Sequence, residues 1–142
     1  MNWREEVTDK LRRYSAMVSA ASSIPLELKS LEAELHAVQS TQAARSGVCG
    51  VRAYEDRLMN IIVKQQELEN QLCSVESWLQ VMDTALGKLM EYERRVLDML
   101  YIQQIAAPQV CRELGLERSS LYRYRDTALK NLTMIMYGVP ES

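Results

Sequence analysis

The sequence predicts an all-α protein, in which an N-terminal long-helix coiled-coil or hairpin arm precedes a C-terminal helix-turn-helix module. Helix breakers are scarce, with five Gly and three Pro in 142 residues, whereas good helix formers are abundant. Apolar residues recur at steps of three and four over most of the chain. Near the C-terminus, two amphipathic segments flank a single glycine. We place the arm at residues 1–88 and the module at residues 89–142.

The N-terminal part of the arm predicts two helices with a break between them. The first covers Trp3 to Ala21 and has one apolar stripe, formed by Trp3, Val7, Leu11, Tyr14, Val18 and Ala21. Ser22, Ser23 and Pro25 indicate a stop and a new start. The second helix then runs from about Pro25 to Ala44, with a stripe formed by Leu28, Leu31, Leu35 and Val38. Two Gly and a Ser predict a loop at Ala44–Gly50.

The longest regular stripe predicts a single helix with a coiled-coil seam over residues 51–89, ending or bending at Gly87. Its members are Val51, Tyr54, Leu58, Ile61, Gln65, Leu68, Leu72, Val75, Leu79, Met82, Leu86 and Leu89. Gln65 is the one polar member and could fix the register if it is buried. The seam could pack against the preceding helix in an antiparallel hairpin, or against a second copy of the chain. We expect a homo-oligomer formed through this helix.

The module begins with a supporting helix from Tyr92 or Glu93 to Tyr101. Its inward residues are expected to be Val96, Leu97 and Leu100. Residues 103–107 connect it to the next helix. Pro108 suits the first position of that short helix, which runs to Leu114 with Val110, Cys111 and Leu114 on one side.

A glycine turn and a basic helix complete the module. Gly115 tolerates the left-handed conformation that ends many helices, and Leu116 can tuck under the turn. Ser119 or Ser120 is expected to cap the last helix. One face of this helix is apolar, with Leu121, Tyr124, Ala128, Leu132 and Ile135. The other is basic, with Arg118, Tyr122, Arg123, Arg125 and Lys130. This pattern is typical of a nucleic-acid-reading helix-turn-helix.

The run from Glu93 to Leu132 resembles region 4 of bacterial sigma factors, in the form found in small phage transcriptional regulators of the ArpU and RinA type. The resemblance lies in ERRVLDMLYI at Glu93–Ile102, VCRELGL at Val110–Leu116 and RSSLYRYRDTALKNL at Arg118–Leu132. It implies a supporting helix, a first DNA-proximal helix and a recognition helix. It also implies promoter recognition in phage or prophage gene control, and it allows contact with host RNA polymerase. Where the family carries capping Ser or Thr residues, this chain has Ala106-Ala107-Pro108 and Glu117.

The predicted DNA-binding residues divide by the part of double-stranded DNA that they would contact. Candidates for base edges or groove walls lie near the start of the recognition helix: Arg118, Ser119, Ser120, Tyr122 and Arg123. Candidates for phosphate contact are Gln109, Arg112, Arg125 and Lys130. The whole chain has a net charge of −2, so the basic character is local.

Composition argues against several other classes of protein. No apolar run is long enough to span a membrane, and the charged N-terminus argues against secretion. Cys49, Cys73 and Cys111 fit neither a disulfide framework nor a metal site, so a cytoplasmic protein is expected. His36 is the one histidine, and no catalytic or phosphate-binding motif is present. We therefore predict no enzyme, no catalytic residue, no metal and no cofactor.

A transcriptional regulator is the preferred interpretation, and two alternatives remain. The first is a DNA-packaging protein like the phage small terminases, which combine a helix-turn-helix with helical oligomerisation into large rings. The second is a helical adaptor that binds only protein. Oligomeric state would distinguish the first alternative, and DNA binding at low salt would distinguish the second.

Overall fold

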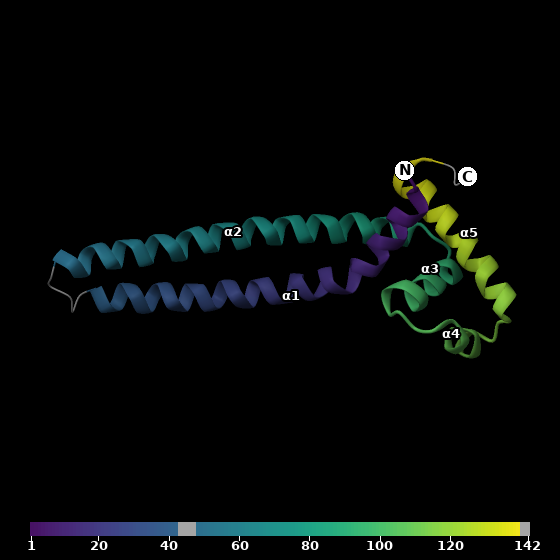
Figure 1. The fold of residues 1–142 in the computed structure, drawn as a ribbon, viewed down its shortest axis with the longest axis horizontal. Helices are drawn as coiled ribbons and strands as arrows, with labels where there is room; N and C mark the ends of the chain where they lie inside the picture. The colour runs from purple at the N-terminus through teal and green to yellow at the C-terminus, as the bar shows by residue number, and fades with distance from the viewer. Residues whose placement is uncertain (43–47, 140–142) are drawn as a thin grey trace. The chain divides into compact units, whose positions relative to one another are not determined.

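The computed structural model describes residues 1–42 and 48–139, and the elements in this part of the chain are helical (Figure 1). Two long helices come first, α1 (Trp3–Gln42) and α2 (Val48–Gly87). They are followed by α3 (Glu91–Leu97), a π-helical turn η1 (Asp98–Ile102), α4 (Ala107–Leu114) and α5 (Arg118–Tyr137). The predicted all-α class, with a long helical hairpin followed by shorter C-terminal helices, is confirmed.

The predicted break near Pro25 is wrong, because α1 continues from Trp3 to Gln42 with Pro25 inside it. A proline within a helix removes one backbone hydrogen bond and crowds the preceding turn. The apolar stripe nevertheless stays in phase across the proline, since Ala21, Ile24 and Leu28 follow one another at steps of three and four. Packing of an apolar face supplies most of the stability of a protein helix. An uninterrupted stripe therefore outweighs the local cost of the proline.

Contacts divide the chain into two compact units. The first unit joins Met1–Val18 to the described chain from Trp78 onward, and the second consists of the described residues within Ser19–Ser77. Of the predicted loop Ala44–Gly50, residues 44–47 lie outside the described residues. Residues 48–50 belong to α2, so the helix begins earlier than the glycines indicated.

In the second unit, the predicted coiled-coil seam of α2 packs against α1. Leu31 and Val38 of α1 and Ile61 of α2 are buried together. The partly buried residues around them are Leu35, Tyr54 and Leu68. Gln65, the polar member of the seam, is half-buried. The hairpin within one chain thus accounts for the stripe in this unit, and pairing with a second copy stays a prediction.

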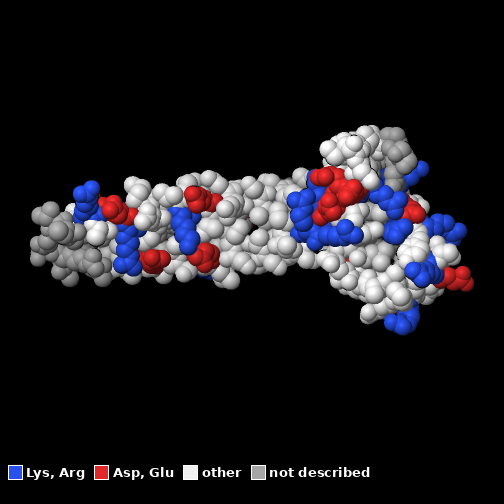
Figure 2. All heavy atoms as spheres, viewed as in Figure 1, with Lys and Arg blue, Asp and Glu red and all other residues white. Residues whose placement is uncertain are grey.

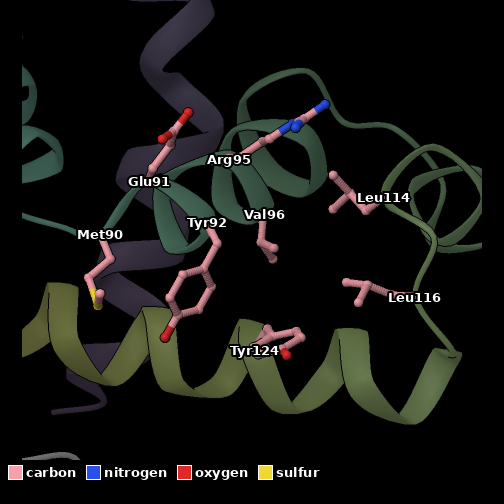
Figure 3. A pocket seen from close by; sticks show the side chains of 8 residues that line it. All are labelled: Met90, Glu91, Tyr92, Arg95, Val96, Leu114, Leu116 and Tyr124. Carbon is pink, nitrogen blue, oxygen red and sulfur yellow. The ribbon is translucent and has the colours of Figure 1, made fainter.

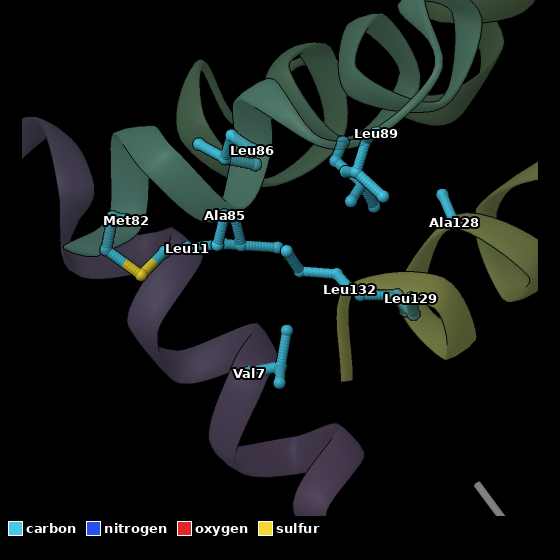
Figure 4. Packing of buried hydrophobic residues seen from close by; sticks show 10 residues of the cluster. Val7, Leu11, Met82, Ala85, Leu86, Leu89, Ala128, Leu129 and Leu132 are labelled. Carbon is cyan, nitrogen blue, oxygen red and sulfur yellow. The ribbon is translucent and has the colours of Figure 1, made fainter. Parts of the chain in front are cut away.

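The core of the first unit is assembled from both ends of the chain. Its buried residues come from the start of α1, the end of α2, the turn that follows α2 and the C-terminal helices: Val7, Leu11, Met82, Ala85, Leu86, Leu89, Leu97, Ala128, Leu129 and Leu132 (Figure 4). Aromatic pairs reinforce it, with ring centroids 4.6 Å apart for Trp3 and Tyr137 and 6.3 Å apart for Tyr14 and Trp78. The first turns of α1 therefore belong to the unit that carries α4 and α5.

The supporting helix differs from its prediction at its C-terminal end. Val96 and Leu97 are buried as expected, but the expected third inward residue, Leu100, is only half-buried, and Met99 is buried instead. The reason is that η1 replaces the last α-helical turn, and the wider π turn rotates the side chains that follow. The buried Glu93 fixes the start of α3, because its Oε1 accepts a 3.2 Å hydrogen bond from the Met90 N–H.

Candidate nucleic-acid interface

The first helix of the helix-turn-helix is anchored by one fully buried residue. Val110 of α4 packs with Val96, Met99 and Leu121 in a second core cluster of the first unit. The helix begins at Ala107, one residue before the predicted start, so Pro108 lies in the first turn, where a missing N–H costs little. Ala106 precedes it with an extended backbone and no side-chain cap.

The glycine turn has the predicted geometry. Gly115 adopts φ 67° and ψ 34°, the left-handed conformation that glycine reaches without steric cost. A Cβ atom at this position would meet nothing within 4 Å, so the backbone angle rather than lack of space favours glycine. The Leu116 N–H donates to the Cys111 carbonyl at 3.0 Å, and the Leu116 side chain packs against the second cluster. This turn sets the direction in which α5 leaves α4.

The predicted capping of α5 by Ser119 or Ser120 is wrong. The helix begins at Arg118, and the N-cap is Glu117, whose backbone is extended and whose side chain makes no capping bond. Ser119 and Ser120 therefore lie inside the first turn. The physical reason is that the left-handed Gly115 returns the chain to the helix within three residues. The cap position consequently falls on Glu117.

One side of α5 is buried as its apolar residues predicted. Leu121, Ala128 and Leu132 are fully buried, and Tyr124 and Ile135 are half-buried. The sequence pattern did not single out Leu129 and Thr133, which are also fully buried. Thr133 is accommodated because its hydroxyl donates to the Leu129 carbonyl at 2.7 Å.

The predicted DNA-binding residues of α5 lie on two faces rather than one. Ser119, Arg123 and Lys130 share one exposed face with Asp126, and we call these four residues the outer stripe. Arg118, Tyr122 and Arg125 follow one another at steps of four and three on a second face, about a quarter turn away at 100° per residue. We call these three residues the Arg–Tyr–Arg stack. Ser120 is half-buried and belongs to neither group.

The Arg–Tyr–Arg stack is held by its own contacts. The Nε of Arg118 donates to the Tyr122 hydroxyl at 3.1 Å, and the guanidinium carbon lies 5.5 Å from the ring centroid. The guanidinium of Arg125 lies 4.7 Å from the same centroid. Both separations are within cation–π range. One aromatic ring thus orders two cations before any partner arrives.

Asp126 connects the stack to the N-terminus of the chain. Its Oδ1 accepts hydrogen bonds from Nε and Nη2 of Arg125, at 3.1 Å and 2.9 Å, and from Nη2 of Arg4. Partial burial opposes ionisation of this carboxyl, but the bonds from both arginines outweigh it and lower the pKa of Asp126 below its usual value. Arg4 was missed from the sequence, because no local pattern links the two ends of the chain.

The remaining candidates lie on α4. Gln109 and Arg112 are both exposed, and the Gln109 amide donates to Glu113 at 3.3 Å. Lys and Arg side chains are spread over the C-terminal helices in the space-filling view (Figure 2). Within residues 1–42 and 48–139, no cluster of His, Cys, Asp and Glu could hold a metal ion. In the same residues, no helix has the length and apolar character to cross a membrane.

A groove of about 730 Å³ lies beside the turn of the helix-turn-helix (Figure 3). Its lining side chains come from α3 and its N-cap residue, α4, α5 and the turn: Met90, Glu91, Tyr92, Arg95, Val96, Leu114, Leu116 and Tyr124. The rings of Tyr92 and Tyr124 meet edge-on across it, with centroids 5.4 Å apart. Met90 and Tyr92 are 63% and 44% exposed, so the groove offers apolar surface to the solvent.

The fold and the site together define an all-α protein in which a glycine-turn helix-turn-helix presents basic residues on its second helix. The chain belongs to the DUF1492 family, described as a protein of unknown function, whose model matches residues 37–133. The match includes α2 to α4 and most of α5. No curated protein and no solved structure matches the chain.

Proposed function

We propose that this protein is a sequence-specific, double-stranded-DNA-binding regulator of transcription that reads promoter DNA with α4 and α5. The observation that carries the proposal is the arrangement of α5. It follows a left-handed glycine turn, buries one side in the core and presents Arg118, Arg123, Arg125 and Lys130 on the others. Helix-turn-helix proteins place the start of the second helix in the major groove.

The two faces of α5 suit different parts of DNA. Arg123 lies on the outer stripe, one turn into the helix, where a guanidinium can form two hydrogen bonds with a guanine. The Arg–Tyr–Arg stack suits the phosphates along one groove wall, since its cations are already ordered. Gln109 and Arg112 on α4 suit the phosphates of the adjoining backbone. The sigma-like resemblance supports a cytoplasmic phage or prophage regulator, with RNA polymerase as a further partner.

We also propose that the protein acts as a homo-oligomer, because a single short recognition helix gains affinity and symmetry from a second copy. The seam of α2 packs on α1 within the second unit. Self-association through α2 would therefore use its outward residues, of which Met59, Ile62 and Val63 are exposed. Sedimentation of the pure protein tests this. A dimer fits the regulator, whereas a large ring would favour the DNA-packaging alternative.

Selection from pooled random duplex DNA at low and moderate salt, followed by sequencing of the retained DNA, tests the proposed function. We expect an enriched motif and an affinity that falls as salt rises. Arg123→Ala should weaken binding of that motif by about 10- to 100-fold, the equivalent of one lost bidentate base contact. Arg57→Ala is the matched control, because Arg57 is exposed on α2 and faces Glu34 at 4.0 Å. Equal binding by Arg123→Ala and the wild type would show that α5 does not read DNA through this face.

The groove beside the turn supports a second candidate, the protein adaptor. An exposed apolar groove of this size suits an apolar segment of a partner protein. If the wild-type protein retains no duplex DNA at any salt concentration, the adaptor becomes the better explanation.

A further inference from the structure

We propose that Tyr122 is a positioning residue of the DNA interface, which holds Arg118 and Arg125 in place for the phosphates of one groove wall. The inference rests on the proposed DNA-binding function of α5 and deepens it. The sequence predicted that Tyr122 itself contacts a base edge or a groove wall. Its contacts instead connect it to the two neighbouring arginines of the Arg–Tyr–Arg stack.

The first step is how Arg118 is held. Arg118 is the first residue of α5, and it is exposed. An exposed arginine has many rotamers, and ordering such a side chain at an interface lowers affinity. Here the Tyr122 hydroxyl accepts a 3.1 Å hydrogen bond from the Arg118 Nε, and the guanidinium lies over the ring. The bond uses one of the five N–H donors of a guanidinium, so a phosphate can bind the others.

The second step is that the same ring holds Arg125. The guanidinium carbon of Arg125 lies 4.7 Å from the Tyr122 ring centroid. Its Nε and Nη2 also donate to Asp126, at 3.1 Å and 2.9 Å, and its side chain is 28% exposed. These two bonds use two of its five N–H donors, so Arg125 can also bind a phosphate. One tyrosine thus orders two arginines that lie seven positions apart.

The third step is what remains of Tyr122 for DNA. The side chain is half-buried, and two guanidiniums lie within 5.5 Å of its ring centroid. Its hydroxyl oxygen already accepts a bond from Arg118. Tyr122 therefore acts on DNA through the two arginines rather than by its own contact.

The affinity for duplex DNA and its dependence on salt separate positioning from charge, because the slope counts the phosphates that the protein neutralises. The probe is a random-sequence duplex of about 30 base pairs, or about three helical turns. Tyr122→Phe keeps the ring and should weaken binding about 2- to 10-fold, the usual effect of having to order one long side chain. Tyr122→Leu frees both arginines and should weaken binding about 5- to 100-fold. Neither variant should change the slope, whereas Arg118→Gln and Arg125→Gln should each reduce it by about one.

Combined variants test whether Tyr122 acts through the arginines. They are measured at low salt, where the remaining cations still attract DNA. In an Arg118→Gln background, Tyr122→Phe should cause no further loss, because the hydroxyl has no guanidinium left to hold. When both arginines are replaced by Gln, Tyr122→Leu should cause no further loss either. If Tyr122→Leu then costs as much affinity as it does in the wild type, Tyr122 contacts DNA itself and the positioning role is overturned.

The matched control is Tyr54→Phe, which removes a tyrosine hydroxyl from α2 in the second unit. It should keep the wild-type affinity and slope. Because Tyr122 is half-buried, thermal unfolding of each Tyr122 variant is the folding control. If Tyr122→Leu does not fold, Tyr122→Phe alone and in the Arg118→Gln background decides the outcome.

The inference and the proposed function can fail separately. If the wild-type protein binds duplex DNA and Arg123→Ala weakens it, but the folded Tyr122 variants bind like the wild type, only the role of Tyr122 is refuted. If the wild-type protein does not bind duplex DNA, both are refuted.

Discussion

Leu121→Ala is the most direct test of how α5 is held in place. Leu121 has no exposed surface and lies in the second core cluster with Val96, Met99 and Val110. These neighbours come from α3, η1 and α4, so the side chain joins α5 to every other helical element around the turn. Truncation to alanine should therefore lower the free energy of unfolding of the whole first unit.

The expected magnitude follows from the atoms removed. The substitution deletes three carbon atoms, and burial contributes about 0.8 kcal/mol for each, or about 2.4 kcal/mol in all. The cavity left behind adds to this, and buried Leu→Ala changes typically cost about 2–5 kcal/mol. Because buried residues of α3, η1 and α4 surround the site, little collapse is possible, and we expect about 3–4 kcal/mol.

Urea unfolding followed by tryptophan fluorescence is a suitable assay, because Trp3 and Trp78 both belong to the first unit. The matched control is Leu26→Ala, since Leu26 is 66% exposed and the same atoms are removed. We expect the control to change stability by less than about 0.5 kcal/mol. A loss below about 1 kcal/mol for Leu121→Ala would refute the packing described for α5.

Two further predictions concern the arm and the junction of α1 with α2. Pro25→Ala should raise the free energy of unfolding by about 1–3 kcal/mol, because it restores a backbone hydrogen bond within α1 and removes a steric clash. Thermal unfolding followed by circular dichroism should therefore show a higher melting temperature, and a lower one would contradict the prediction. The hydrogen bond from the Tyr14 hydroxyl to Asp83, with partial burial, raises the pKa of Tyr14 to about 12. The protonated hydroxyl is favoured in the folded state, so this contribution is present below pH 10 and is lost as the pH rises from about 10 to about 12. An ultraviolet titration should show one late tyrosine that disappears in Tyr14→Phe, and an identical titration curve for the variant would show that Tyr14 is not the late group.

Most of the fold could be predicted because it depends on local patterns. The unbroken seam of α2 and the conformation of Gly115 follow from spacing and backbone sterics within a few residues. The same local reasoning failed at Pro25, where a general rule about proline was weighed more heavily than a stripe that stays in phase. It failed again at Ser119 and Ser120, where two good capping residues follow the true cap position at Glu117.

The site could be predicted only in part, because its organisation depends on contacts distant in sequence. The sequence pattern identified the basic residues of α5 but placed them on a single face. It gave no sign that Arg118 and Arg125 both stack on the ring of Tyr122 and so form a second face. The link from Arg4 to Asp126 had no local signal. Neither did the burial of Val7 and Leu11 against α5, because an amphipathic stripe shows that a face is buried without showing what covers it.

The discontinuous first unit has a consequence for how the protein is made. Residues 1–18 leave the ribosome before their partners in α5, which are synthesised more than a hundred residues later. Chains fold during synthesis at about 5–20 residues per second, so Val7 and Leu11 wait for several seconds before the core can close. The hairpin of the second unit can form during that interval, because its contacts lie within Ser19–Ser77. The helix proposed to read DNA thus gains its packing partners Val7 and Leu11 from a segment that is made before the hairpin of the second unit.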